Sequence, residues 1–297
     1  YRMKIFSYFI TIMFLLILSG IAVFFYGLWY FGKDLPDYKE LSKYNPNVVT
    51  RIHAGNGALL AEYATQKRVF VPISVIPKKV INAFISAEDK DFYNHFGIDL
   101  MATLRALITN VKNIGTNKRL IGASTITQQV AKNFLLSSEM SYERKIKEAI
   151  LAIRIERAFT KNEILELYLN EIYLGFKSYG VAAAALNYFD KSLDNLDLSE
   201  AAFLAALPKA PNNYNPIYKN KQAIMRRNWV LSQMNKNGFI EDDIRKIESK
   251  KLINIRKSSG IDEGYAPYFT EEVRKILIKN GKIGSKLYTN GYSVRTT

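Results

Sequence analysis

A long apolar run near the start of the chain sets it apart from the remainder. Residues 5–32 contain no charged side chain, and about 20 predominantly apolar residues are enough for a helix that crosses a bilayer. Residues 5–32 are therefore expected to form a transmembrane signal-anchor helix after a cytoplasmic tail of residues 1–4, because Arg2 and Lys4 precede the run. A cleaved signal peptide is the alternative, but its apolar core would span only about 7–15 residues.

The pattern changes twice after the anchor. Residues 33–59 form an expected linker with a short β element, and the turn residues Gly55, Asn56 and Gly57 predict a hairpin. From about residue 78 to residue 207 the apolar residues recur at helical spacing. Two apolar stripes follow this spacing, one formed by Val80, Ala83, Phe84 and Ala87 and the other by Ile146, Ala149, Ile150 and Ile153.

Capping signals locate further helices. Thr160 and Glu163 have capping-box spacing, which predicts the start of a helix with the sequence EILELYLNEIYL that Gly175 ends. Asp197 begins a second helix, which Pro208 closes. Residues 220–257 are expected to be helical, and residues 262–297 should form a helix followed by an extended piece. The fold class predicted from these patterns is mainly α.

Composition narrows the chemistry that the chain can perform. Its 297 residues include no cysteine and two histidines, and its formal net charge is +15. A disulfide framework, a cysteine nucleophile and a histidine-rich metal site are therefore excluded. The positive charge indicates an anionic partner, such as a nucleic acid, an anionic lipid or a phosphorylated substrate. A nucleic acid is disfavoured by the membrane anchor. The chain begins with Tyr1, and we expect it to be part of a longer protein.

Adjacent carboxylates follow the first apolar stripe. Glu88 and Asp89 stand at the end of a predicted helix, where a partly desolvated carboxylate can act as a general base. A solvated helix terminus would show the same spacing. Asp89 and Asp91 also match the short D-x-D pattern of metal-dependent sugar transferases, but three-residue matches are common.

A second polar segment has the sequence GASTITQQVAKN. In a helix, Thr125, Gln128, Gln129 and Lys132 would share one face. Such a face suits a phosphate or a sugar, although an exposed helix surface would look alike. A third segment places Arg144 and Lys145 close to Glu148, on the side of a helix opposite the isoleucine stripe. This arrangement is either a surface ion pair or a cationic group for a pyrophosphate.

Together, five segments resemble in order the signature motifs of the peptidoglycan glycosyltransferase domain of class A penicillin-binding proteins. They read EDKDFYNHFGID, GASTITQQVAKN, RKIKEAILAIRIE, EILELYLNEIYLG and AALNYFDKSLDNLDLSEAAFLAALPKAPNNYNP. The resemblance implies a glycosyltransferase domain over residues 60–225, followed over residues 226–297 by a linker and the start of a truncated transpeptidase region. The second motif carries Ala123 where many members have glycine.

The resemblance implies a lysozyme-like, two-lobed fold and an inverting transferase. The substrates would be lipid II and the lipid-linked glycan, and undecaprenyl pyrophosphate would be released during cell-wall synthesis. The implied location is the bacterial inner membrane, with a single span, a cytoplasmic N-terminus and the catalytic domain on the outer face. Other cell-wall synthesis proteins are possible partners. The parent protein would also be a penicillin-sensitive D,D-transpeptidase, whose S-x-x-K serine lies outside this chain.

By motif position, Glu88 resembles the general base and Glu148 the second catalytic carboxylate. The resemblance implies substrate-binding roles for Thr125, Gln128, Gln129, Lys132, Asn133, Arg144 and Lys145. It implies structural roles for Asp89, Phe92, His95, Gly97 and Glu171. No cofactor is firmly implied, although a divalent ion such as Mg²⁺ could sit near Glu148.

The residues themselves agree with this assignment on two points. A pyrophosphate leaving group requires fixed cations, and a polyprenyl substrate requires an enzyme at the membrane. Residues 98–120 are apolar with interspersed Arg105, Lys112, Lys118 and Arg119, as in a lipid-facing lobe. A membrane-anchored, lysozyme-like glycan-cleaving enzyme is the alternative, and a non-enzymatic membrane scaffold belongs to a third class.

Overall fold

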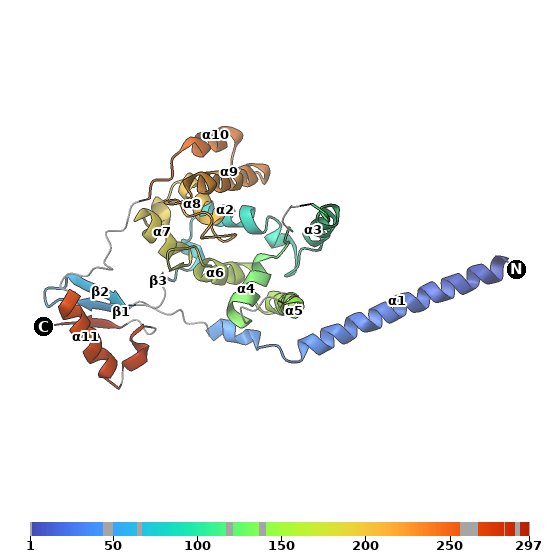
Figure 1. Ribbon diagram of the computed structural model, residues 1–297, viewed down its shortest axis with the longest axis horizontal. Coiled ribbons are helices and arrows are strands. Elements are labelled where there is room, and N and C mark those ends of the chain that lie inside the picture. Colours follow the sequence, from blue (N-terminus) through green and yellow to red (C-terminus); the bar gives the residue numbers. More distant parts are fainter. Residues whose placement is uncertain are drawn as a thin grey trace.

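Helices form most of the described chain, and its strands belong to two small sheets (Figure 1). The computed structural model describes residues 2–43, 50–63, 67–116, 121–136, 141–255, 267–281, 283–288 and 292–296. The helices are α1 (Arg2–Gly32), α2 (Lys78–Glu88), α3 (Leu100–Lys112), α4 (Ile126–Leu135), α5 (Tyr142–Ala158), α6 (Lys161–Glu171), α7 (Val181–Phe189), α8 (Leu198–Ala206), α9 (Asn220–Lys236), α10 (Asp242–Lys250) and α11 (Pro267–Lys279). The strands are β1 (Thr50–His53), β2 (Leu59–Tyr63), β3 (Lys67–Arg68), β4 (Ser178–Tyr179) and β5 (Ser293–Arg295). The predicted mainly α fold is confirmed.

One hydrophobic core holds the helices that carry the candidate site. Helix α2 packs on α8 and α9, while α4 packs on α5 and α6. Aromatic rings fill the centre, with Phe84 set edge-on to Tyr168 and Tyr188 set edge-on to Phe203. Helix α9 runs through residues 225 and 226 without a break, so residues just beyond the expected domain end also pack on this core.

The capping box predicted at Thr160 starts α6, and the helix start predicted at Asp197 is confirmed as the start of α8, also with a capping box. Thr160 accepts a hydrogen bond from the backbone N–H of Glu163, and Asp197 accepts one from that of Glu200. The predicted end of α6 at Gly175 is wrong, because the helix stops at Glu171. The next residues turn back instead, and Tyr173 forms a β-bridge with Tyr179.

Helix α5 buries a different side from the one that its isoleucine stripe suggested. Its buried residues are Glu148, Leu151, Ala152 and Ile155, whereas Ile146 is exposed. Glu148 therefore faces the core, contrary to its expected place on the side away from the apolar stripe. The helix also contacts α1 and the 3-10 helix Tyr38–Lys43, so apolar residues occur on more than one of its sides.

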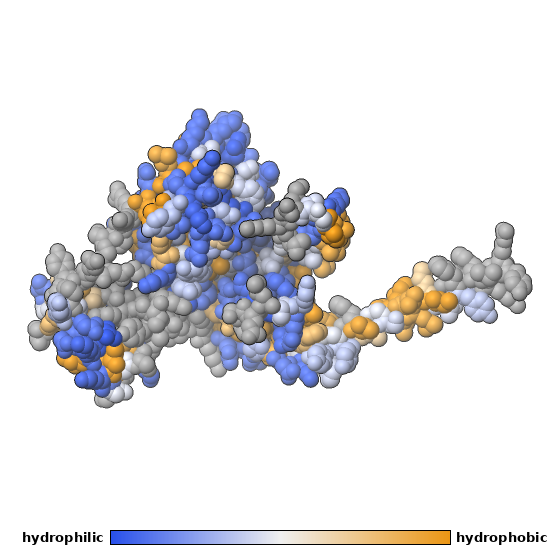
Figure 2. Space-filling view, in the orientation of Figure 1, coloured by the Kyte–Doolittle hydropathy of each residue, from blue (hydrophilic) through white to orange (hydrophobic). Residues whose placement is uncertain are grey.

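Helix α1 projects away from the other helices (Figure 1). Within the described residues, Thr11–Gly32 is long and apolar enough to cross a membrane, with a mean hydropathy of 2.3 and none of its most apolar window buried. Figure 2 shows hydrophobic patches along its coloured part. The helix ends against the globular part, where Arg154 on α5 donates a hydrogen bond to the carbonyl of Gly32 at 3.1 Å.

A second hydrophobic surface belongs to α3, which has no buried residue (Figure 2). Its exposed apolar side chains are Leu100, Met101, Leu104, Leu107, Ile108 and Val111. The apolar surface expected over residues 98–120 is thus present along α3. Lys118 and Arg119 lie outside the described residues.

The predicted hairpin is confirmed, since β1 pairs antiparallel with β2 around the Gly55–Gly57 turn. Strand β5, the predicted extended piece near the end of the chain, adds to β1 in parallel. With α11 these strands lie to one side of the larger helical body (Figure 1). The expected helix–extended order after residue 262 is confirmed from Pro267 onward.

Candidate active site

Glu88, the last residue of α2, lies where two cavities meet. One cavity, of about 560 Å³, is lined by residues from α4, α5 and α9, including Lys132, Glu148 and Arg226. The other, of about 410 Å³, lies between α2, α3 and the chain before α4, and Asp99 and Arg105 line it. Glu88 contributes to both walls. A group held in either cavity can therefore reach the same carboxylate.

A single described hydrogen bond orients the Glu88 carboxylate. Gln129, one turn into α4, donates from its side-chain nitrogen to Glu88 Oε2 at 2.8 Å. Burial raises the pKa of Glu88, while this hydrogen bond and the charges of Arg226, Lys209 and Lys132 oppose the rise. A carboxylate with a raised pKa that is still held by one donor is suited to accept a proton.

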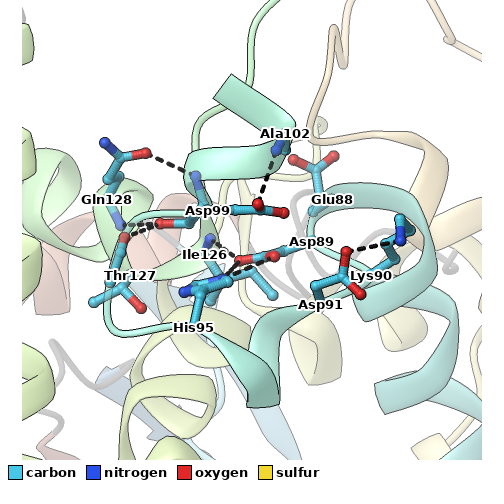
Figure 3. A network of polar contacts seen from close by, with 12 residues as sticks. Glu88, Asp89, Lys90, Asp91, His95, Asp99, Ala102, Ile126, Thr127 and Gln128 are labelled. Carbon is cyan, nitrogen blue, oxygen red and sulfur yellow. Dashed lines mark hydrogen bonds and ion pairs between the residues drawn. The ribbon is translucent and has the colours of Figure 1, made fainter. Parts of the chain in front are cut away.

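Asp89 follows Glu88 directly and contributes to the wall of the smaller cavity, but its carboxylate is turned towards His95 and Ile126 (Figure 3). Its two oxygens each lie 3.0 Å from Nε2 of His95, and its Oδ2 also accepts the backbone N–H of Ile126 at 2.9 Å. Asp89 thus ties the loop after α2 to the first turn of α4. Its contacts are those of a structural group.

The N-terminus of α4 is fixed by two further residues of the second motif. Thr125 is the N-cap, and it forms a capping box with Gln128. The Thr125 hydroxyl also donates to the carbonyl of Gly97 at 2.6 Å. Gly97 has φ +84°, and a Cβ there would lie 2.7 Å from the backbone of Ala152. The four residues expected on one helical face therefore divide. Thr125 holds the cap and lines the smaller cavity, whereas Gln128, Gln129 and Lys132 line the larger one. Gln128 also takes part in the cap, because its side-chain oxygen accepts the Thr125 backbone N–H.

A cationic group surrounds the second candidate carboxylate. Glu148 is 1% exposed, and its oxygens lie 2.5 Å from Nζ of Lys145 and 3.1 Å from Nε of Arg144. Lys132 lines the same cavity, and burial lowers its pKa, as do the charges of Lys145 and Arg144, whereas Glu148 raises it. Positive charge thus exceeds negative charge in this part of the cavity.

Three residues without an assigned role also line the larger cavity. Lys209 follows α8, and Arg226 and Trp229 come from α9. The Arg226 guanidinium lies 3.7 Å from the centre of the Trp229 ring, and burial lowers the pKa of Arg226. Lys209 stands within the fifth motif, but the sequence around Arg226 carries no motif. Only the spacing of three residues on a predicted helix could have indicated that Arg226 and Trp229 share a face.

The other candidate residues lie outside the cavities. Asn133 is exposed on α4 and is not among the cavity-lining residues. Phe92 is fully buried, with its ring edge-on to His95. Glu171 forms an ion pair with Arg68, and both side chains are largely buried. Arg144 reaches the site through Glu148 rather than through the cavity wall.

The described residues do not fit a divalent metal ion near Glu148. They contain no cluster of three His, Cys, Asp or Glu side chains that could hold one. Lys145 and Arg144 already face both oxygens of Glu148. Protein cations therefore occupy the positions around this carboxylate that a metal ion would require.

Comparison with known proteins agrees with this geometry. A family model described as transglycosylase matches residues 56–235. Penicillin-binding protein 1A of Rickettsia bellii is 47% identical over 97% of the chain, and that of Escherichia coli is 42% identical over 99%. The chain covers 36% and 34% of these two relatives, about a third of their length.

A solved structure shows the same fold. The crystal structure of penicillin-binding protein 1A from Haemophilus influenzae aligns with a TM-score of 0.51 and 30% identity, over 85% of this chain and 27% of that one. Residues 56–235, which the family model matches, include all five motifs and the lining residues of the two cavities beside Glu88. The chain therefore belongs to the transglycosylase family and is a peptidoglycan glycosyltransferase region of the class A penicillin-binding protein type.

Proposed function

We propose that this domain polymerises lipid II, using the lipid-linked glycan as donor and a new lipid II as acceptor. The observation that carries the proposal is the position of Glu88 between two cavities, one of them lined by cations. Two sugar substrates have to meet at one base, and one of them has to lose a pyrophosphate. The arrangement around Glu88 meets both requirements.

In the proposed reaction the 4-hydroxyl of the acceptor sugar attacks C1 of the donor sugar. Glu88 takes the hydroxyl proton while the new C–O bond forms, and the bond from C1 to the pyrophosphate oxygen breaks. Attack from the face opposite an α-linked pyrophosphate gives a β-1,4 bond. Burial favours the base role, because it raises the pKa of Glu88 towards the working pH.

The departing pyrophosphate would lie in the larger cavity, against Lys132 and Lys145. Fixed cations in a partly buried site stabilise charge that develops on a leaving group. Glu148 is proposed to hold Lys145 and Arg144 in place, since its oxygens lie 2.5 and 3.1 Å from their nitrogens. Lys209 and Arg226 line the same cavity and add positive charge near Glu88.

We further propose that the chain sits on the outer face of the inner membrane with a cytoplasmic N-terminus. Helix α1 would span the bilayer, and the exposed apolar side chains of α3 would enter its interface. Such a location brings the cavities close to a substrate whose polyprenyl chain stays in the membrane. A glycan-cleaving enzyme would not need the cations around Glu148.

The test is polymerisation of labelled lipid II by the purified chain in detergent, read as a ladder on a gel. Glu88→Gln should reduce polymer formation by at least about 10²-fold, the loss expected when a general base is removed. Glu143→Gln is the matched control, because Glu143 is an exposed carboxylate on α5. Polymer formed by a folded Glu88→Gln variant at the rate of Glu143→Gln would contradict the role of Glu88.

A further inference from the structure

A buried carboxylate that the proposed reaction does not use lies between α4, α5 and α6. Glu156, near the end of α5, has a side chain only 4% exposed. The Thr127 hydroxyl of α4 donates to its Oε1 at 2.6 Å, and Nζ of Lys161 on α6 donates to the same oxygen at 2.7 Å. Glu156 therefore joins three helices at one atom.

Lys161 extends this junction to the loop after α2. Its ammonium donates to the backbone carbonyl of His95 at 2.6 Å and lies 4.5 Å from the centre of the Phe92 ring. The loop that carries Asp89, Phe92 and His95 is thus fixed from one side by Lys161. A second contact of the same loop is the hydrogen bond that Asp89 accepts from the backbone N–H of Ile126, at the N-terminus of α4.

The junction joins the loop after Glu88 to α4 and α5, which carry Gln129, Lys132 and Glu148. Helix α2 and its loop bear Glu88, α4 bears Gln129 and Lys132, and α5 bears Glu148 with its cations. Thr127 lies two residues before Gln129, on the first turn of α4, and is completely buried. A shift of this turn would change the distance between Gln129 and Glu88, now joined by a 2.8 Å hydrogen bond.

We propose that Thr127, Glu156 and Lys161 form a positioning network that sets α4 against the loop after α2 and so keeps Gln129 on Glu88. The inference rests on the proposed function, since it assigns Glu88 as the base. None of the three residues lines either cavity. They act through Gln129 and Lys132, and they are positioning residues rather than catalytic ones.

The network predicts a change in pH dependence as well as in rate. The polar and titratable groups that interact with Glu88 are Gln129 and Lys132 from α4, Tyr168 from α6, Lys209 after α8 and Arg226 from α9. The Gln129 hydrogen bond favours the charged form of Glu88, so its loss raises the pKa of that carboxyl further. A variant with a displaced α4 then needs a higher pH to ionise its base, and the acid limb of its kcat profile moves to higher pH.

The experiment measures kcat and KM for lipid II polymerisation from acid to alkaline pH, using the full chain in detergent. Thr127→Val removes the hydroxyl at nearly constant volume, and Thr127→Ser restores it. Thr50→Val is the matched control, because Thr50 is equally buried and accepts a hydrogen bond from Tyr292 in the distant sheet. Circular dichroism and Tm establish that each variant is folded.

The expected result for Thr127→Val is a fall in kcat of about 10- to 100-fold, the cost of a small displacement of reacting groups. Its acid limb should move to higher pH, whereas Thr127→Ser and Thr50→Val should keep the wild-type profile. The double variant Glu156→Gln/Lys161→Met keeps the junction neutral, and it should reproduce the Thr127→Val profile.

Two results would overturn the inference. One is a folded Thr127→Val variant with wild-type kcat and an unmoved acid limb. The other is an equal shift in Thr50→Val, which would show a general effect of destabilisation. The proposed function is tested separately in the same assay, because it fails if the wild-type chain itself makes no polymer from lipid II.

Discussion

Replacement of Lys132 should lower kcat for polymerisation without destabilising the fold. Lys132→Met retains most of the aliphatic stem of the side chain but removes the ammonium. Lys132 lines the larger cavity beside Lys145, and its pKa is lowered mainly by burial. A desolvated cation at this position interacts strongly with a phosphate that enters the cavity.

The size of the effect follows from that position. Removing one preorganised group that stabilises developing charge costs about 10²–10³ in kcat, or roughly 2.7–4 kcal/mol. Lys132→Arg should recover only part of this loss, because a planar guanidinium replaces a compact ammonium. Folding should be unaffected or improved in Lys132→Met, since burial and the nearby positive charges of Lys145 and Arg144 disfavour the charged lysine.

The assay is the initial rate of lipid II consumption with saturating substrate, together with Tm for each variant. Lys236→Met is the matched control, because Lys236 is an exposed lysine near the end of α9 and outside both cavities. Wild-type kcat in a folded Lys132→Met variant would show that the cavity does not receive the pyrophosphate, and it would refute the reasoning.

Three further predictions concern stability and membrane binding. Burial raises the pKa of Glu88, so its contribution to stability is present below its unfolded pKa and is lost as the pH rises through the folded pKa. The Tm of Glu88→Gln relative to that of the wild type should therefore be higher at pH 7.5 than at pH 4. An equal Tm difference at both pH values would contradict this. Gly97→Ala should lower the free energy of unfolding by about 2 kcal/mol or more, because the new Cβ would lie 2.7 Å from the Ala152 backbone at a positive φ. Denaturant titration measures this loss. An unchanged midpoint of the unfolding transition would rule out the close contact. A chain lacking α1 should still sediment with anionic vesicles, because the exposed apolar side chains of α3 bind the bilayer interface. Leu107→Glu should weaken this binding, since Leu107 is exposed on that apolar surface. Vesicle binding unchanged by Leu107→Glu would exclude α3 as the contact.

The sequence predicted the helices with strong local signals more accurately than it predicted which of their sides are buried. Thr160 and Asp197 start helices by bonds within four residues, and such bonds depend little on the rest of the fold. Helix α5 has apolar residues on two sides, and periodicity alone does not tell which one enters the core. Glu148 can be buried because Arg144 and Lys145 form ion pairs with its carboxylate. These ion pairs depend on side-chain conformations that periodicity does not predict.

The candidate site shows the same division between local and tertiary information. The motif order singled out Glu88, but adjacency could not tell that Asp89 turns towards His95 and Ile126 (Figure 3). Arg226 reaches the cavity because α9 packs on α2, a contact between residues far apart in the chain. No pattern near Arg226 records that packing, so its place beside Trp229 became visible only in the fold.

The most direct test of the central claim separates synthesis from cleavage. The chain is incubated with labelled lipid II and, separately, with purified lipid-free glycan strands, and both reactions are analysed on gels. The cationic cavity beside Glu88 predicts polymer from lipid II, release of undecaprenyl pyrophosphate and intact glycan strands. Shortened strands together with no polymer from lipid II would contradict it and would favour a lysozyme-like hydrolase.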